Sequence, residues 1–197
     1  MPFASPGDVS KADLRRAVLA RRDAMPVDDR AAAAVAVAAR PFPLPLSPGM
    51  VVSGYSPLRS EINPVPLMRR LAELGARLAL PVVTRRGLPL VFRAFAFGDP
   101  LSPGVWGIRE PPPEAPEVLP DVLIVPLAAF DRRGQRIGYG AGYYDRSLAA
   151  LREAQKPVVA AGLAYSGQEI PCVPATARDE RLDLVLTERE VIDLRGT

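Results

Sequence analysis

Histidine is absent from the 197 residues of this chain, and cysteine occurs once, as Cys172. Without histidine the chain lacks the commonest general base and metal-binding side chain, so catalysis would have to use carboxylates, lysine, arginine, tyrosine or a bound cation. A single cysteine excludes an intramolecular disulfide framework. No uninterrupted apolar run approaches the roughly 18 residues of a membrane span, and charges interrupt residues 11–22 too often for a signal peptide. The sequence therefore predicts a cytoplasmic protein that does not enter a membrane.

A large excess of one charge is also lacking, because 25 basic residues stand against 22 acidic ones and the net charge is +3. There is no block of like charges and no basic tail, and the basic residues near the N-terminus are mixed with acidic ones. Nucleic-acid-binding proteins usually gather their basic residues on one face. The charge pattern therefore predicts a protein with no nucleic-acid partner.

Proline, in contrast, is abundant: it supplies 23 of 197 residues, about 12%, against a typical share near 5%. Hydrophobic residues make up 48% and charged residues 24%, which are ordinary values for a globular protein. The prolines are therefore expected in the loops and strand ends of a packed protein. With no internal repeat and no linker, we expect a single domain over residues 1–197.

Apolar periodicity and turn residues predict alternating helices and strands. Ser10 is expected to cap a helix that runs to about residue 25, and Gly75 to end another that starts at 63–64. Helices are also expected over 28–40 and 144–154, strands over 50–55, 77–83, 90–95, 122–127, 158–163 and 182–187, and a proline-rich loop over 98–120. This alternation predicts the α/β class, with three layers (α/β/α) and a mainly parallel sheet.

The most informative segment is VPLAAFDRRGQRIGYGAGYYDR, residues 125–146, in which a buried strand leads through a glycine-rich loop into a helix. Glycines at alternate positions let main-chain amides approach a ligand, and the N-terminus of the following helix adds free N–H groups and a positive dipole end. These features predict an anion site, usually for phosphate. The glycines are Gly134, Gly138, Gly140 and Gly142, and the arginines expected to face the anion are Arg132, Arg133 and Arg136.

The segment matches neither the P-loop pattern nor GxGxxG, so its spacing does not identify a nucleotide, and a simple turn of the chain is the alternative. Asp145, at the end of the loop, would repel a bare phosphate, but it suits Mg²⁺, which bridges carboxylates and phosphates. Asp179 is a second acidic candidate, with a surface or capping role as its alternative.

Several residues outside this loop have two interpretations on pattern alone. Lys11 and Arg15 lie four residues apart, which is more often a solvated helix face than a ligand site. Glu61 follows a strand in a loop, where α/β folds place ligands. Trp106, the only tryptophan, is either a packing residue of the proline-rich loop or a plate on which a flat ring stacks.

Six segments, in this order, carry a resemblance to a known family. They are KADLRRAVLARRDAM, GYSPLRSEINPVPL, LALPVV, WGIREP, PDVLIVPLAAFDRRGQRIGYGAGYYDR and DERLDLVLTE, and they span nearly the whole chain. With these segments the chain resembles the 5-formyltetrahydrofolate cyclo-ligases, also called 5,10-methenyltetrahydrofolate synthetases. The resemblance implies a Rossmann-like fold of the NagB/RpiA/CoA-transferase type and a monomer.

The resemblance also implies a reaction. It is the ATP- and Mg²⁺-dependent closure of 5-formyltetrahydrofolate to 5,10-methenyltetrahydrofolate, with release of ADP and phosphate, through a phosphorylated formyl (iminium phosphate) intermediate. ATP and the folate would be the binding partners, and Mg²⁺ the cofactor. A chain without histidine can supply this chemistry, because phosphoryl transfer depends on positioning and charge neutralisation more than on a proton shuttle.

By position, the resemblance implies several sets of site residues. Those implied for ATP are Lys11, Arg15, Arg132, Arg136, Gly138, Tyr139, Gly140, Ala141, Gly142, Tyr143 and Tyr144. Those implied for the folate are Tyr55, Ser56, Glu61, Trp106, Tyr139, Gly140, Ala141, Gly142 and Tyr143. Arg136, Tyr143 and Tyr144 are implied as catalytic residues, and Asp145 and Asp179 as metal ligands.

The chain departs from the family pattern at three positions. Ala141 stands where a glycine is usual, Gln135 where a tyrosine or another bulky residue is common, and Arg178 where the family often has histidine. None of these changes removes a group that the chemistry needs. The last one makes the assignment of Asp179 less secure.

Two other functions stay open on the sequence: a small-molecule kinase or transferase that uses the same anion loop, and a non-catalytic folate- or nucleotide-binding module. Glu61 and Trp106 argue against the first, because a sugar or acyl acceptor needs no pterin-sized aromatic slot. The intact Asp145 and the intact glycine series argue against the second.

Overall fold

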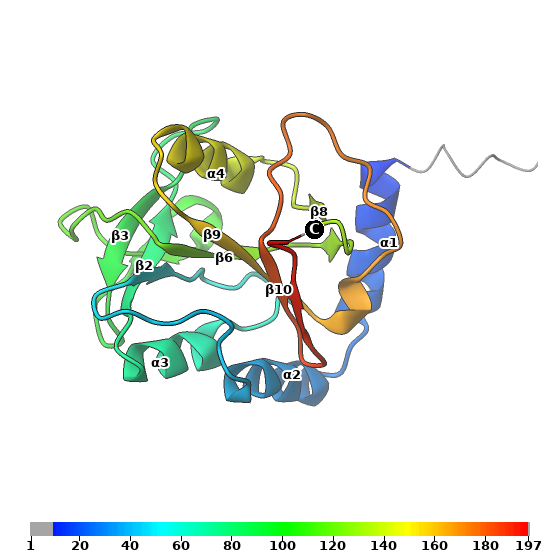
Figure 1. The fold of residues 1–197 in the computed structure, drawn as a ribbon, viewed down its shortest axis with the longest axis horizontal. Coiled ribbons are helices and arrows are strands. Elements are labelled where there is room, and N and C mark those ends of the chain that lie inside the picture. The colour runs from blue at the N-terminus through cyan, green and yellow to red at the C-terminus, as the bar shows by residue number, and fades with distance from the viewer. Residues whose placement is uncertain (1–9, 197) are drawn as a thin grey trace, which may run out of the picture.

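A seven-stranded mixed sheet forms the centre of the computed structural model, which describes residues 10–196 (Figure 1). In spatial order its strands are β11 (Val191–Asp193), β10 (Leu184–Leu186), β9 (Val159–Leu163), β6 (Val122–Pro126), β1 (Val51–Ser53), β2 (Arg77–Val82) and β3 (Val91–Phe95). The inner strands from β10 to β2 run parallel, and the edge strands β11 and β3 are antiparallel to their neighbours.

Helices cover both faces of this sheet, as Figure 1 shows: α2 (Val27–Ala39) and α3 (Val65–Glu73) lie on one face, and α4 (Tyr143–Glu153) lies on the other. The predicted three-layer α/β fold with a mainly parallel sheet is thereby confirmed. Helix α1 (Lys11–Asp23) lies at one side, and Ser10 caps it as expected, because its Oγ accepts a hydrogen bond from the next turn at 3.2 Å. No helix between residues 10 and 196 has the length and apolar character needed to cross a membrane.

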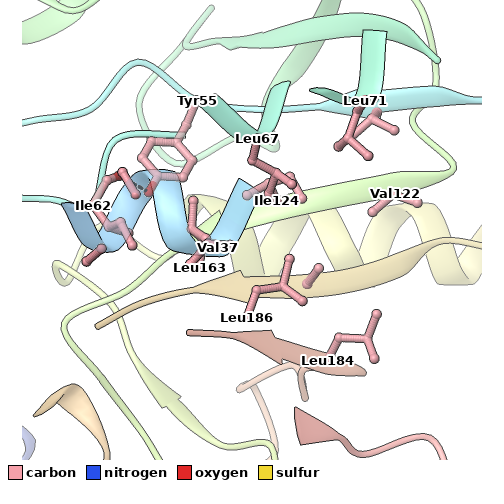
Figure 2. Packing of buried hydrophobic residues seen from close by; sticks show 14 of the residues in the cluster. Val37, Tyr55, Ile62, Leu67, Leu71, Val122, Ile124, Leu163, Leu184 and Leu186 are labelled. Carbon is pink, nitrogen blue, oxygen red and sulfur yellow. Dashed lines mark hydrogen bonds between the residues drawn. The ribbon is translucent and has the colours of Figure 1, made fainter. Parts of the chain in front are cut away.

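Apolar clusters on the two faces of the sheet hold these layers together. Figure 2 shows one of them, in which Val37 of α2 and Leu67 of α3 pack with Ile124 of β6. The neighbouring strand residue, Leu123, belongs to the cluster on the opposite face, together with Leu148 of α4. Successive strand residues point to opposite faces, so the continuous apolar run of β6 serves both clusters. Each such buried side chain contributes roughly 1.5–3 kcal/mol to stability.

Two short hairpins differ from the expectation of plain loops. The proline-rich loop contains β4 (Ser102–Pro103) and β5 (Arg109–Glu110), with a 3-10 helix at Val105–Gly107 between them. The glycine-rich segment contains β7 (Ala129–Phe130) and β8 (Arg136–Ile137). Strands of two residues are too short to show an alternating pattern, and the same holds for the three residues of β11.

The proline-rich segment also lies along β3, the edge strand of the sheet. The amide of Ala94 donates a hydrogen bond to the carbonyl of Pro116 at 2.8 Å, and the amide of Val118 donates to the carbonyl of Phe92 at 2.9 Å. Pro116 therefore takes part in this pairing only as an acceptor, as expected of a residue that has no amide proton to donate.

The loop between β7 and β8 is held by Asp131, whose side chain is fully buried. Its carboxylate accepts hydrogen bonds from the amides of Arg133 (2.9 Å), Gln135 (3.1 Å) and Val173 (2.8 Å), and from the Arg133 guanidinium (2.7 Å). Burial would raise the pKa of Asp131, but these hydrogen bonds together outweigh it and lower the pKa below its usual value.

We predict that Asp131→Asn lowers the free energy of unfolding by roughly 1.5–3 kcal/mol near pH 7, because it removes charge-assisted hydrogen bonds from a buried site. The folded-state pKa of Asp131 is depressed, so its stabilisation is present above the unfolded pKa of about 3.9 and is lost as the pH falls through the folded pKa. Urea unfolding should therefore show a smaller difference between wild type and variant at about pH 3 than near neutrality. The same difference at both pH values would contradict this account.

Candidate functional site

A cavity of about 630 Å³ opens where parallel strands of the sheet end. Tyr55 lies just beyond the end of β1, Val83 follows β2, and Pro126 is the last residue of β6; all three line the cavity. The carboxyl ends of parallel strands are where α/β folds place ligands. The wall also includes residues of the glycine-rich loop, α4, α1 and the 3-10 helix, so the cavity collects most of the residues predicted for ligand binding.

The glycine-rich loop and the first turn of α4 form one wall of this cavity, which includes Ala141. Gly140 and Gly142 have φ angles of 95° and 66°, a left-handed backbone that glycine adopts without a steric penalty. Gly142 is the N-cap of α4, which begins at Tyr143. Free amides and the positive end of the helix dipole meet at this point and suit an anion.

Arg15 of α1 supplies a cation beside the same loop. Its Nε donates to the carbonyl oxygen of Gly138 at 2.7 Å, and its two terminal nitrogens lie 3.8 and 3.9 Å from the position that a Cβ on Gly140 would take. Arg15 has no carboxylate partner within residues 10–196. Its charge is therefore available to a ligand at this loop, and its contact with ATP stays a prediction.

Arg136 and Asp145 form a part-buried ion pair at the end of the loop, and both line the cavity. Arg136 Nη2 donates to Asp145 Oδ1 at 2.6 Å, and Arg136 Nη1 donates to the carbonyl oxygen of Glu180. The amide of Glu180 donates to the same Asp145 oxygen at 3.1 Å. Burial lowers the pKa of Arg136, although the nearby Asp145 carboxylate opposes that shift. No residue in the described part of the chain donates to Asp145 Oδ2, so this oxygen is free to bind a cation.

Asp179 lies beside Asp145 and Arg136, because the backbone of the next residue, Glu180, bonds both of them and the Asp179 charge acts on the pKa of Arg136. Asp179 does not line the cavity; Lys11 Nζ lies 2.7 Å from both of its oxygens, and Thr176 donates to Oδ2 from its amide at 2.6 Å and its hydroxyl at 2.8 Å. No group of three or more histidine, cysteine or acidic side chains that could hold a metal exists between residues 10 and 196. Asp179 pairs with Lys11 in this structure, and the metal role of Asp179, like the ATP contact of Lys11, stays a prediction.

Arg132 lies outside the cavity wall, so its predicted ATP contact has no structural support. Its guanidinium donates to Glu169 at 2.8 Å and to Glu190 at 2.6 Å. Arg133 is engaged by Asp131. Of the three arginines expected to face the anion, only Arg136 reaches the cavity, because carboxylates elsewhere bind the other two.

The loop after β1 supplies two of the side chains predicted for the folate. Tyr55 is buried and its hydroxyl donates to the carbonyl oxygen of Ile62 at 2.6 Å. Ser56 Oγ donates to the carbonyl oxygen of Arg109 at 2.6 Å. Both residues line the cavity, and their hydroxyl groups hold the loop in place.

Glu61 lies farther along the same loop, as a carboxyl group in the cavity wall. Its Oε2 accepts a hydrogen bond from the amide of Leu58 at 2.8 Å. Burial raises the pKa of Glu61, and the hydrogen bonds from Leu58 and Tyr139 offset only part of that rise. A partly desolvated carboxylate of this kind favours a ligand that brings N–H donors.

Aromatic rings border the mouth of the cavity. Trp106 is 63% exposed, and its ring meets that of Tyr143 edge to face, with centroids 5.9 Å apart. Tyr144 is half-buried, and burial raises the pKa of its phenol, which therefore keeps its proton at neutral pH. All three line the cavity, so Trp106 lies where a flat ring could stack on it.

Arg22 is a site residue to which sequence analysis assigned no role. It is only 4% exposed; its Nε donates to Ser60 Oγ at 2.9 Å and its Nη1 to the Tyr139 hydroxyl at 2.5 Å. It thereby ties α1 both to the loop after β1 and to the glycine-rich loop. The available signal was its position seven residues after Arg15, on the same face of the helix.

Comparisons with known proteins agree with one another. The model of the 5-formyltetrahydrofolate cyclo-ligase family matches residues 8–188 of the chain. The chain is 35% identical over 195 residues to the 5-formyltetrahydrofolate cyclo-ligase of Mycolicibacterium smegmatis, which covers 94% of this chain and 98% of that relative. It is also 35% identical over 136 residues to the cyclo-ligase of Escherichia coli K12, covering 66% of this chain and 74% of the relative.

Two solved structures of 5,10-methenyltetrahydrofolate synthetases also resemble the structure of this chain. The 5,10-methenyltetrahydrofolate synthetase of Aquifex aeolicus superposes with a TM-score of 0.78 at 30% identity, over 95% of this chain and 94% of the other. The 5,10-methenyltetrahydrofolate synthetase of Mycoplasma pneumoniae shares the fold, with a TM-score of 0.69 at 21% identity, over 91% and 99%.

We predict that Gly140→Val abolishes ATP binding while the protein still folds. Valine at a φ of 95° is strained, so the loop must move, whereas the core does not include this exposed position. Gly98→Val is the matched control, because Gly98 has a φ of 109° and lies outside the cavity wall. Titration calorimetry with ATP measures the affinity, and thermal unfolding checks the fold. Undiminished ATP affinity in Gly140→Val, or an equal loss in Gly98→Val, would contradict this role of the loop.

Proposed function

Because the chain belongs to the 5-formyltetrahydrofolate cyclo-ligase family, we propose that it closes 5-formyltetrahydrofolate to 5,10-methenyltetrahydrofolate, with conversion of ATP to ADP and phosphate. The observation that carries this proposal is that one cavity has two unlike walls. The first wall holds the glycine-rich loop, the N-terminus of α4 and Arg15, which suit a triphosphate. The second holds Tyr55, Glu61 and Trp106, which suit a pterin. A nucleotide and a folate could therefore meet in this cavity.

The chemistry needs ATP because the formyl oxygen is a poor leaving group. Attack of this oxygen on the γ-phosphorus forms a new O–P bond and breaks the bond to ADP, which gives the iminium phosphate. N10 of the folate then attacks the formyl carbon, the C–O bond breaks with phosphate as the leaving group, and N10 loses its proton. Both steps depend mainly on alignment and on stabilising the charge of the phosphoryl group.

Residues of the first wall would provide that stabilisation. Arg15, the amides of the glycine-rich loop and the helix N-terminus would hold the phosphates. Arg136 is fixed by its bonds to Asp145 and to a main-chain carbonyl, so its orientation is set before a ligand arrives. Tyr144 keeps its proton and can donate it in a hydrogen bond to a phosphate oxygen. Prearranged donors in a cavity that excludes water stabilise developing charge strongly.

The end of the loop fits a magnesium ion through a single carboxylate. Asp145 has one oxygen held by Arg136 and the amide of Glu180, and its other oxygen has no donor in the described part of the chain. Mg²⁺ commonly takes one or two protein carboxylates together with phosphate oxygens and waters. When bound, the ion would neutralise and orient the triphosphate. We propose Asp145 as the protein ligand on the cavity wall; Asp179, which pairs with Lys11 and does not line the cavity, stays the second candidate.

Residues of the second wall would orient the folate. Glu61 would accept hydrogen bonds from the N–H groups at the polar edge of the pterin, which would repay the desolvation of its carboxylate. Trp106 and Tyr143 would contact the flat ring system. In this arrangement the formyl group would point towards the first wall, where the γ-phosphate is expected.

The proposal predicts that the methenyl absorbance appears only when ATP, Mg²⁺ and 5-formyltetrahydrofolate are all present. Asp145→Ala should lose most of this activity, because the Mg²⁺ ligand and the partner of Arg136 are both removed. Asp193→Ala is a suitable control, since Asp193 pairs with Arg195 outside the cavity. Product formation by wild type without ATP would overturn the proposed reaction, and unchanged activity in Asp145→Ala would overturn the metal assignment.

We further predict that Glu61→Gln raises the KM for 5-formyltetrahydrofolate by roughly 10- to 150-fold, the value of one hydrogen bond to a charged group, and leaves the KM for ATP nearly unchanged. The pKa of Glu61 is raised, so in the wild type the carboxylate is lost, and the KM for the folate rises, as the pH falls towards that pKa. Initial rates across a pH series should show this rise in the wild type and not in the variant. Equal losses towards both substrates would point to a damaged fold instead.

A further inference from the structure

We propose that Arg59 is a substrate-binding residue, whose guanidinium pairs with a carboxylate of the glutamate moiety of 5-formyltetrahydrofolate. This inference rests on the proposed function, since it names what the second wall of the cavity binds beyond the pterin. It is carried by the position of Arg59, by its lack of a protein partner, and by the backbone that presents it.

Arg59 is the cavity arginine that the protein leaves without any partner. The arginines in the cavity wall are Arg15, Arg22, Arg59 and Arg136. Arg136 is paired with a carboxylate, Arg22 is bonded to hydroxyl groups, and Arg15 donates to the glycine-rich loop. Within residues 10–196, Arg59 forms no hydrogen bond, ion pair or ring contact. Its full charge is therefore available to a ligand.

The backbone at Arg59 is strained and firmly held. Its φ of 53° lies in the left-handed region, which is sterically unfavourable for a residue other than glycine. The turn persists because Glu61 binds Leu58 twice, through its carboxylate at 2.8 Å and its amide at 3.0 Å. Between them, Ser60 is buried and bonded to Arg22 and Asp23. A rigid turn thus presents a long cationic side chain to the cavity.

The position of this turn indicates which anion Arg59 meets. The two proposed substrates carry negative charge in different places, ATP on its phosphates and the folate on the carboxylates of its glutamate. The phosphates have their own cations, Arg15 and Arg136, beside the glycine-rich loop. Arg59 lies on the wall assigned to the folate, and it is exposed whereas Glu61 is half-buried. With the polar edge of the pterin at Glu61, the glutamate at the other end of the folate would lie towards solvent, on the side where Arg59 is exposed. A guanidinium and a carboxylate can form two parallel charge-assisted hydrogen bonds, which suits this end of the substrate.

Arg59→Gly tests the proposal without harming the fold. Glycine takes a φ of 53° without strain, so the variant should unfold at the wild-type temperature or above it. Binding of 5-formyltetrahydrofolate in the absence of ATP can be followed through the fluorescence of Trp106, the only tryptophan. We expect the folate to bind roughly tenfold more weakly or worse, with the KM for ATP unchanged. 5-Formyl-6-methyltetrahydropterin, which lacks the p-aminobenzoylglutamate and therefore has no carboxylate, should bind equally to wild type and variant.

Two further variants separate charge from backbone strain. Gln155 has a φ of 52° and lies outside the cavity wall, so Gln155→Gly relieves the same kind of strain and should leave folate affinity unchanged. Arg59→Lys keeps the charge but not the planar fork, and it should recover part of the lost affinity.

Unchanged folate affinity in Arg59→Gly, or the same loss with the carboxylate-free pterin compound, would overturn the assignment of Arg59. A rise confined to the KM for ATP would also overturn it, because Arg59 would then serve the phosphates. Failure of the proposed function has a different signature: wild type that binds the folate through Arg59 but forms no methenyl product would refute the reaction and support the binding residue. Wild type that binds no folate at all would overturn both.

Discussion

The parallel pairing of β1 with β6 is the constraint on which the cavity depends. Val52 lies opposite Val122 in the same direction, so both strands deliver their following loops to one edge of the sheet. The loop after β1 carries Glu61, and the segment after β6 carries the glycines and then α4. Two walls of different chemistry, far apart along the chain, therefore face one cavity. Arg22 links both walls to α1, which explains why this charged side chain is buried.

Local patterns made most of the fold predictable, because the long strands and the helix ends follow from apolar runs and capping residues. The two-residue strands could not be found this way, since their pairing depends on partners elsewhere in the chain. The candidate site, too, was only partly predictable from the sequence. Glu61 reaches the cavity because it follows a parallel strand, and Trp106 was linked to the site by family resemblance. The pairing of Arg132 with Glu169 and of Asp179 with Lys11 could not be predicted, because sequence spacing does not show which distant charge a side chain meets.

The four arginines of the cavity wall fall into two groups with different roles. Arg22 and Arg136 bond side chains of the protein and fix the geometry of the cavity, whereas between residues 10 and 196 Arg15 and Arg59 have no carboxylate partner, and we propose that they meet the ligands. Guanidinium groups stay protonated at every ordinary pH, so the positive charge offered to the substrates does not change near neutrality. This arrangement suits a chain that has no histidine to act as a proton shuttle.

The proline-rich segment along β3 limits how two copies of the molecule could pair through the edges of their sheets. An uncovered edge strand exposes a row of unpaired amides and carbonyls to which a strand from another molecule can add. On β3 part of that row is already taken by Pro116 and Val118, and the prolines beside them have no amide with which to continue a ladder. The prolines of this segment thus protect the edge strand β3 from pairing with strands of other molecules.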